Sequence, residues 1–244
     1  MNWSNIPSYI MTVSPEDDPN RSVQMTVEQL KSLGSVPNIV YRQKDPVSGR
    51  RGCFQSHQFV AQMLLNSNDP YWFIFEEDAE LVSNTSAINA IEKIKQIQTI
   101  DSEWDYINLG ALFDKIDQTY ENKTIVKTNS FIESHAYLLS RNGAAKIVQW
   151  NFTIHAFDVE FQHHENIRSY IIRPSVFLQR HIYPTNGGGF DMKYQLTRLG
   201  LGNAVVRIRL MQEDGSIWIL YFVLILAWLF FAWKLFLRHL KKLF

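Results

Sequence analysis

Cysteine is nearly absent from this sequence, and long apolar runs are rare. The single cysteine among 244 residues, Cys53, excludes an internal disulfide framework and a zinc site built from several thiolates. Only one apolar run is long enough to cross a bilayer, which excludes a polytopic membrane protein. With 46% hydrophobic and 20% charged residues, the chain has enough apolar surface to fold, so it is not a disordered tail.

An excess of basic charge is also lacking. The 24 Lys and Arg equal the 24 Asp and Glu in number. Four of the basic residues and none of the acidic ones follow Ile217, so the preceding chain has an excess of four acidic side chains. Binding to nucleic acid depends on Lys and Arg that meet phosphates. We therefore expect no nucleic-acid partner, and a single sizeable core before residue 217.

The one long apolar run covers residues 217–237 (IWILYFVLILAWLFFAWKLFL) and contains one charge, Lys234. At ~1.5 Å per residue, a helix of this length spans roughly 30 Å, the thickness of the hydrocarbon core of a bilayer. Trp218 and Trp233 lie near its ends, where aromatic side chains meet the membrane interface. The run predicts a single-pass C-terminal transmembrane helix, with a buried core helix as the alternative.

The two ends of the chain bear on topology. The N-terminal segment MNWSNIPSYIMTV has neither the basic region nor the apolar stretch of a signal peptide, so we expect the large domain to face the cytosol. The basic residues after the span favour the opposite orientation by the positive-inside rule. The predicted layout is a domain over residues 1–203, a linker over 204–216, a membrane span over 217–237 and a basic tail over 238–244.

Short apolar stretches alternate with helical patterns before the span, which favours an α/β fold. The stretch YWFIF is continuously apolar, as is typical of a strand buried on both faces. We expect strands at residues 9–13, 38–41, 71–75, 106–109, 136–139, 169–172 and 176–178. We expect helices at 23–33, 53–65, 86–97 and 142–150, the last capped by Ser140.

Three consecutive acids, Glu76, Glu77 and Asp78, directly follow the strand at 71–75. Ligands bind outside the carboxyl ends of strands in an open α/β sheet. Side chains two apart point to the same side of an extended chain, so Glu76 and Asp78 can share one hard cation, Mn²⁺ or Mg²⁺, that bridges the phosphates of a nucleotide. The alternative is an acidic first turn of a helix, which the helix dipole favours.

Further motifs flank the acids. They are Gly52-Cys-Phe-Gln-Ser56-His57, the strand end Ile107-Asn108-Leu-Gly110, and SHAYLLSRNGAA from Ser134. In their order and spacing these motifs resemble glycosyltransferase family 25, the lipopolysaccharide and collagen-type galactosyltransferase relatives. The resemblance covers roughly residues 9–179, and Arg21 looks like an early arginine of that family. Glu77 stands where the family usually has aspartate.

The resemblance implies a GT-A-type fold and metal-dependent transfer of a hexose, galactose or glucose, from a UDP-sugar. The acceptor would be a glycan, a lipid-linked sugar or a hydroxylated protein side chain. Glu76 and Asp78 would hold the metal, and Asp158 or Glu77 would be the catalytic base, although a plain helix-start acid is the alternative for Asp158. Residues implied to bind the donor or substrate are Arg21, Gly52, Ser56, His57, Asn108, His135 and Tyr137.

Two other functions fit parts of the sequence. One is an inactive GT-A-like module that serves as a membrane-tethered scaffold. The other is a metal-dependent hydrolase that uses the same acids, but no nucleophile motif is present. The stretch from His155 to Glu165 is rich in histidine and acids but has no His-Glu-x-x-His spacing, so we expect a solvated helix face rather than a zinc site there.

Overall fold

The structure is a computed structural model that describes residues 2–13, 23–113, 117–121 and 123–180. Arg21 and the predicted linker, membrane span and basic tail lie outside the described residues. Within the described ranges, no helix is both long and apolar enough to cross a membrane.

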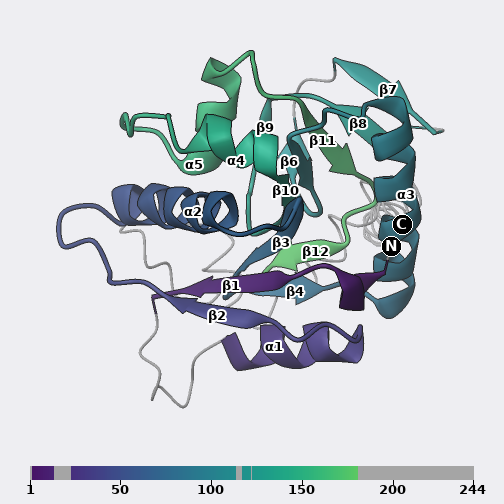
Figure 1. The fold of residues 1–244 in the computed structure, drawn as a ribbon, viewed down its shortest axis with the longest axis horizontal. Helices are drawn as coiled ribbons and strands as arrows, with labels where there is room; N and C mark the ends of the chain where they lie inside the picture. Colours follow the sequence, from purple (N-terminus) through teal and green to yellow (C-terminus); the bar gives the residue numbers. More distant parts are fainter. Residues whose placement is uncertain (1, 14–22, 114–116, 122, 181–244) are drawn as a thin grey trace, which may run out of the picture. The chain divides into compact units, whose positions relative to one another are not determined.

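An eight-stranded mixed sheet forms the centre of the fold (Figure 1). In sheet order its strands are β2 (Asn38–Tyr41), β1 (Ser8–Thr12), β3 (Tyr71–Glu76), β10 (Ala136–Ser140), β5 (Tyr106–Asn108), β11 (Ser169–Ile172), β8 (Ile125–Lys127) and β7 (Gln118–Tyr120). Strand β1 pairs in parallel with β2 and β3, whereas β10 runs antiparallel to both β3 and β5. Strands β1, β3 and β5 therefore run in the same direction, and their carboxyl ends share one edge of the sheet.

We call this edge the acidic edge and define it by Thr12, Glu76 and Asn108, the last residues of β1, β3 and β5. Two small antiparallel sheets complete the strands: β4 (Ala79–Leu81) with β12 (Phe177–Gln179), and β6 (Leu112–Phe113) with β9 (Phe131–Ile132). Residues 77 and 78 form the turn from β3 into β4. The chain thus leaves the large sheet at the acids.

Helices cover both faces of the sheet, which gives three layers (Figure 1). The helices α1 (Val23–Ser32) and α3 (Asn84–Ile100) pack on one face, and the other face carries α2 (Gly49–Asn66), α4 (Arg141–Ile147) and α5 (Phe157–Glu160). Two short 3₁₀ turns, η1 (Trp3–Asn5) and η2 (Phe161–His163), adjoin these helices. The expected α/β class is confirmed.

Strand β3 shows why the sheet is covered on both sides. Phe73 and Phe75 lie in the apolar cluster under α1 and α3, whereas Trp72 and Ile74 lie in the cluster under α2 and α4. All four side chains are buried, and each contributes about 1.5–3 kcal/mol relative to an exposed position. The strand is therefore buried on both faces, as the continuous apolar run predicts.

Serine caps mark the starts of α2 and α4. The Ser140 hydroxyl accepts the Gly143 N–H at 3.0 Å and starts α4, which confirms the expected cap. Ser48 caps α2 in the same way by accepting the Arg51 N–H at 3.3 Å. Helix α2 consequently begins one turn earlier than expected, and Gly52 lies inside the helix.

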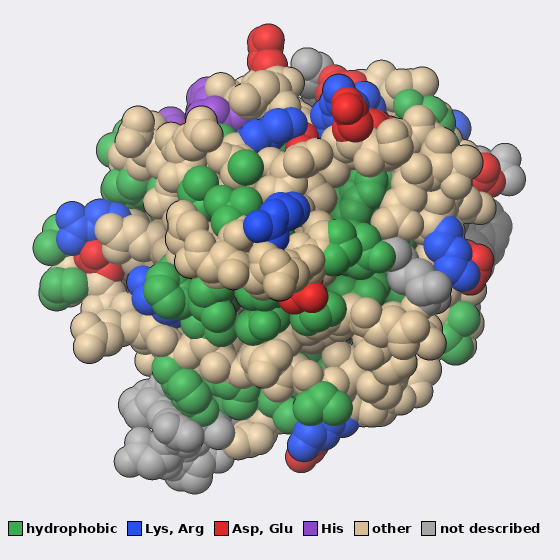
Figure 2. Space-filling model, in the orientation of Figure 1, with side chains coloured by type: hydrophobic (Ala, Val, Ile, Leu, Met, Phe, Trp, Pro, Cys, Tyr) green, Lys and Arg blue, Asp and Glu red, His purple; other side chains and the backbone are tan. Residues whose placement is uncertain are grey.

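The molecular face in Figure 2 mixes charges of both signs. Lys and Arg side chains lie among Asp and Glu, and apolar side chains fill much of the surface between them. Large apolar side chains exposed on the described part of the chain are dispersed over several elements: Met25, Val36, Tyr41, Val47, Phe59, Ile88, Ile100, Ile132 and Ile154.

Candidate functional site

The turn at the end of β3 brings the acidic triplet to the acidic edge. Glu76 is the last residue of the strand, and its backbone N–H donates to the His135 carbonyl at 2.8 Å. The Thr26 hydroxyl donates to the carbonyls of Glu77 and Ala79, at 2.8 and 3.0 Å. The backbone of the turn is therefore held from α1 on one side and from the start of β10 on the other.

Asp78 is half-buried, and in the described part of the chain no cation is bonded to its carboxylate. Its Oδ2 accepts a 3.0 Å hydrogen bond from the amide of Gln179, and its Oδ1 is buried with no hydrogen-bond partner in the described part of the chain. Burial, and next the negative charge of Glu76, raise the pKa of Asp78 well above its ordinary value. A bound cation would relieve both effects, since it would supply the missing partner and the opposite charge.

Glu76 is oriented by a buried histidine. Nε2 of His57 lies 3.1 Å from Glu76 Oε1, and Nδ1 lies 2.8 Å from the hydroxyl of Tyr137. The imidazole also stacks on Phe157, with ring centroids 3.9 Å apart. Burial opposes ionisation of Glu76, but the hydrogen bond from His57 and the charges of His57 and His135 outweigh it and lower the pKa of this carboxyl.

His57 thus links two other predicted site residues, Glu76 and Tyr137. Its side chain is only 1% exposed, and that of Glu76 is 26% exposed. The imidazole is therefore a positioning group, and the carboxylate it orients remains accessible to a ligand from solvent. Tyr137 reaches the same histidine from β10.

Glu77 contacts the end of the neighbouring strand. Its Oε2 accepts a hydrogen bond from the Thr12 hydroxyl, at the carboxyl end of β1. This contact ties the middle acid of the triplet to the sheet, whereas Glu76 points to His57 and Asp78 to Gln179. The sequence analysis did not single out Thr12 or Gln179, because a lone hydroxyl or amide carries no distinguishing pattern.

Asp158 approaches the same edge from the start of α5. Its Oδ2 accepts the Glu133 N–H at 2.6 Å and its Oδ1 accepts the Val159 N–H at 2.9 Å. Burial is the main reason that the pKa of Asp158 is raised, and the charge of Glu76 adds to it. The amide of Asn108 donates to the Glu133 carbonyl at 2.8 Å. The backbone of Glu133 is therefore bound at its N–H by Asp158 and at its carbonyl by Asn108.

Glu133 is a site residue that sequence reasoning missed. Its φ is 73°, in the left-handed region that a non-glycine residue adopts only at a cost of roughly 1–2 kcal/mol. Its charge also acts on Glu76. Backbone strain of this kind concentrates at functional sites, but the single sequence shows no sign of it.

The remaining predicted residues lie at or near this edge in different ways. The hydroxyl of Ser56 donates to the Gly52 carbonyl at 2.7 Å within α2, so both residues belong to the helix. A Cβ on Gly52 would lie 2.9 Å from Cβ of Asp45, which explains the glycine by close packing. His135 is buried beside Gly110. A Cβ added to Gly110 would lie 2.6 Å from Nε2 of His135.

Cys53 lies one helical turn before His57 on α2. The thiol is half-buried, and burial, followed by the charges of Glu76, Asp158 and Asp78, raises its pKa well above the ordinary value. One ligand atom each from Cys53, His57 and Glu76 lie within 4.8 Å of one another. The single cysteine therefore belongs to the same cluster as the acids.

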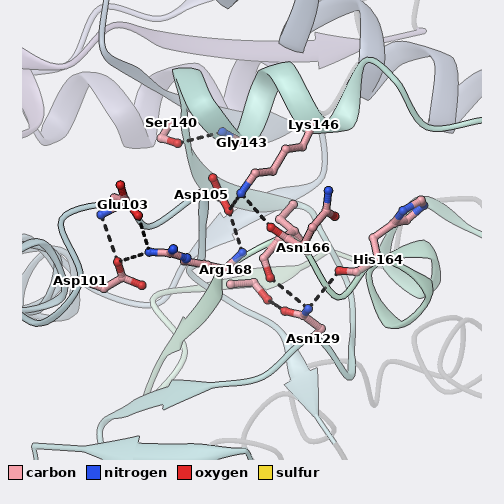
Figure 3. Close-up of polar contacts among 12 residues, drawn as sticks. Asp101, Glu103, Asp105, Asn129, Ser140, Gly143, Lys146, His164, Asn166 and Arg168 are labelled. Carbon is pink, nitrogen blue, oxygen red and sulfur yellow. Dashed lines mark hydrogen bonds and ion pairs between the residues drawn. The ribbon is translucent and has the colours of Figure 1, made fainter.

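A second buried carboxylate, Asp105, lies at the opposite edge of the sheet, just before β5 (Figure 3). Its side chain is 0% exposed, and its Oδ2 accepts from Lys146 Nζ at 2.5 Å and from the Arg168 N–H at 2.7 Å. Lys146 also donates to the Asn166 carbonyl at 2.8 Å. Lys146 therefore supplies the counter-charge of Asp105 from within the protein.

A surface pocket of about 340 Å³ opens beside this ion pair, lined in part by Glu103, Lys146 and Arg168. None of the predicted site residues lines it. Arg168 joins the carboxylates of Asp101 and Glu103 at 3.0 and 2.9 Å, so the charges of the pocket are matched within the protein. We assign the arrangement in Figure 3 to stability.

The solved structures that are similar to this chain include the following three. The crystal structure of A197 from STIV aligns with a TM-score of 0.47 and 14% identity, over 70% of this chain and 82% of that one. A glycosyltransferase involved in the glycosylation of the major capsid of PBCV-1 aligns with a TM-score of 0.46 and 8% identity, over 71% and 93%. Apo UDP-glucose pyrophosphorylase aligns with a TM-score of 0.41 and 8% identity, over 73% and 76%. No curated protein sequence matches the chain.

The comparison with protein families identifies the chain. The profile described as glycosyltransferase family 25 (LPS biosynthesis protein) matches residues 38–161, which is 124 of the 244 residues. The matched range contains α2 with Cys53 and His57, the acidic triplet at residues 76–78, and Asp158. The resemblance found in the sequence is therefore confirmed, and the chain belongs to glycosyltransferase family 25 and is a glycosyltransferase.

Proposed function

We propose that this glycosyltransferase is metal-dependent and moves a hexose, galactose or glucose, from a UDP-sugar to a hydroxyl group. The acceptor would be a glycan, a lipid-linked sugar or a hydroxylated protein side chain. The proposed metal, Mn²⁺ or Mg²⁺, binds at Glu76 and Asp78.

The observation that carries the proposal is the unpartnered Oδ1 of Asp78. A buried carboxylate oxygen without a donor is unfavourable, and here the neighbouring Glu76 adds negative charge. Oxygen ligands from carboxylates are those that Mn²⁺ and Mg²⁺ prefer. The residues present therefore fit a hard divalent cation.

When bound, the cation would neutralise the charge that grows on the leaving diphosphate. The protein contributes the orientation of the ligands. His57, held by Tyr137 and stacked on Phe157, fixes one oxygen of Glu76. Gln179 fixes one oxygen of Asp78. Because His57 and Gln179 hold these carboxylates in place, Glu76 and Asp78 need little reorganisation when the donor arrives.

Asp158 is the proposed base for the acceptor hydroxyl. Burial raises its pKa, and a carboxylate with a raised pKa takes a proton from a hydroxyl more readily at neutral pH. Its two backbone donors, Glu133 and Val159, hold the carboxylate in place. In this assignment the hydroxyl oxygen attacks the sugar carbon, the bond to the diphosphate breaks, and the hydroxyl proton moves to Asp158.

We also propose that residues 217–237 anchor the enzyme in a membrane, with the catalytic domain on the cytosolic side. The support is the length and uniform apolarity of that run. Protease treatment of sealed vesicles tests the orientation. A domain that is digested without detergent fits the proposal, and a protected domain contradicts it.

The metal requirement is tested with the full-length chain. Hydrolysis or transfer of UDP-galactose and UDP-glucose is measured after chelation and again with added Mn²⁺. We expect turnover only with the cation, and a loss of at least about 100-fold in Asp78→Asn, similar to the removal of a single transition-state charge contact.

The matched control is Glu92→Gln. This side chain on α3 is exposed and pairs with Lys95, so its loss should leave turnover unchanged. Metal-independent turnover, or full activity in Asp78→Asn, contradicts the proposal. The absence of turnover with any donor would instead favour the inactive scaffold.

A further inference from the structure

We propose that Cys53, His57 and Glu76 form a second metal site, which takes a thiophilic divalent ion such as Zn²⁺ and shares Glu76 with the site proposed for Mn²⁺. Their ligand atoms lie within 4.8 Å of one another. A thiolate, an imidazole and a carboxylate are the three ligand types found around zinc in proteins.

The secondary structure explains why the three side chains converge. Cys53 and His57 are four residues apart on α2, so they share one face of the helix. Glu76 is the last residue of β3, and its Oε1 already lies 3.1 Å from His57 Nε2. Around a tetrahedral zinc ion, ligand atoms are roughly 3.5 Å apart, so the cluster needs to contract by about 1 Å.

The surroundings of His57 suit ligation through Nε2. Its other nitrogen, Nδ1, lies 2.8 Å from the Tyr137 hydroxyl. In the tautomer that donates an N–H to Tyr137, Nε2 carries no proton, so it can bind the metal in place of its hydrogen bond to Glu76. Ligating histidines commonly use their second nitrogen in this manner. The stacking of the imidazole on Phe157 restrains the ring without occupying either nitrogen.

Access and charge also favour a cation here. Glu76 is 26% exposed and the residue Cys53 is half-buried, so the cluster adjoins solvent at Glu76. The carboxylates of Asp78 and Asp158 act on the thiol electrostatically and attract positive charge. When the ion binds, the sulfur loses its proton to solvent and becomes the third protein ligand, which leaves one tetrahedral position open.

The ligand types separate the two sites chemically. Sulfur and nitrogen favour Zn²⁺, whereas the oxygens of Glu76 and Asp78 favour Mn²⁺ or Mg²⁺. Because Glu76 belongs to both, Zn²⁺ at the cysteine site withdraws a ligand from the other. Zinc therefore inhibits the enzyme in competition with Mn²⁺, a consequence that rests on the proposed function, although the site itself does not.

The test uses Co²⁺ as a spectroscopic substitute for Zn²⁺ in the full-length protein after chelation. Since Cys53 is the only cysteine of the chain, a thiolate-to-cobalt charge-transfer band reports this site alone. We expect one equivalent of Co²⁺ to produce the band and Zn²⁺ to abolish it. We also expect Cys53→Ser to remove the band and to weaken Zn²⁺ binding at least about tenfold, the smallest loss typical of disturbed metal sites.

The control is His163→Gln. His163 is exposed and stacks with His155 at 5.2 Å between ring centroids, so this pair is the alternative place for Zn²⁺. The control should keep the band, the Zn²⁺ affinity and the basal turnover. A wild-type protein without the band, or a Zn²⁺ affinity lowered by His163→Gln and not by Cys53→Ser, overturns the site.

Inhibition is measured separately, as the ratio of turnover with and without Zn²⁺ within each variant. Wild type should regain activity as Mn²⁺ is raised, and Cys53→Ser should resist Zn²⁺. A cobalt band without Mn²⁺-reversible inhibition overturns the sharing of Glu76 and leaves the site. A band in a protein that shows no turnover with any donor contradicts the proposed function alone.

Discussion

Asp78 and Asp105 lie at opposite edges of one sheet, and each has one buried carboxylate oxygen without a hydrogen-bond partner in the described part of the chain. Asp105 has a lysine from α4 bonded to it. The side-chain hydrogen bond of Asp78 comes from a neutral amide, another acid lies beside it, and Arg180 acts on its carboxylate electrostatically. A protein that needs a buried carboxylate for stability provides a bonded counter-charge itself. A carboxylate without a bonded cation is suited to a cation from outside.

The largest effect is expected when the charge of Asp105 is removed. We expect Asp105→Asn to lower the free energy of unfolding by about 3 kcal/mol, because it leaves Lys146 without its partner. The value is at the low end for buried pairs since Lys146 is 29% exposed. Urea denaturation measures the change. A variant as stable as wild type would mean that this ion pair is not structural.

The backbone beneath the same ion pair offers a second test. A Cβ on Gly143 would lie 2.3 Å from the Asp105 carbonyl oxygen, so Gly143→Ala forces α4 away from β5. We expect a loss of about 2 kcal/mol, as for other overpacked sites. Asn142→Ala, on the exposed side of the same helix, should change stability by no more than about 0.5 kcal/mol. Equal effects in the two variants would contradict the close packing.

Without metal, the acidic edge should become less stable as pH rises. Burial and Glu76 raise the pKa of Asp78, so the folded state without metal binds a proton more tightly than the unfolded state does. The stability that this proton provides is complete below the unfolded pKa of about 3.9 and is lost as pH rises through the raised value. Asp78→Asn, which does not titrate, should therefore be more stable than wild type at neutral pH without metal.

Thermal melts at several pH values measure this difference. The gain in stability of Asp78→Asn over wild type should grow with pH and should disappear when Mn²⁺ is added to both proteins. A variant that is less stable than wild type in chelator at neutral pH would show that Asp78 has a counter-charge after all.

The smallest expected effect concerns the group behind Glu76. Tyr137→Phe removes the hydroxyl that contacts His57 Nδ1 and should lower stability by about 1 kcal/mol, the net value of one hydrogen bond. If His57 positions Glu76, kcat should fall while KM for the donor changes little. A purely structural tyrosine would lower stability and leave kcat intact.

Much of the fold could be predicted from the sequence because local patterns determine it. The run YWFIF, the strand Asn38–Tyr41 and the Ser140 cap all depend on neighbours within a few residues. The strands β7 and β8 were missed. Each has only three residues, and β7 is largely exposed, so no apolar period marks it.

The candidate site, too, could be predicted only where nearby residues in the sequence form a pattern. The acidic triplet and the motif from Gly52 to His57 are visible in the sequence, and the fold brings Glu76 and His57 into contact. The roles of Gln179, Thr12 and Glu133 depend on pairings over 25 to 101 positions of the chain, which no local pattern encodes. In the sequence, Cys53 was considered only as the single cysteine, because its proximity to Glu76 arises only when α2 packs on the sheet.

The central claim is that the acidic edge takes its counter-charge from outside the protein. The most direct test is Mn²⁺ binding to the full-length chain at neutral pH, measured by calorimetry for wild type, Asp78→Asn and Asp105→Asn. We expect wild type and Asp105→Asn to bind Mn²⁺ and Asp78→Asn to lose Mn²⁺ binding. Equal binding by wild type and Asp78→Asn would contradict it.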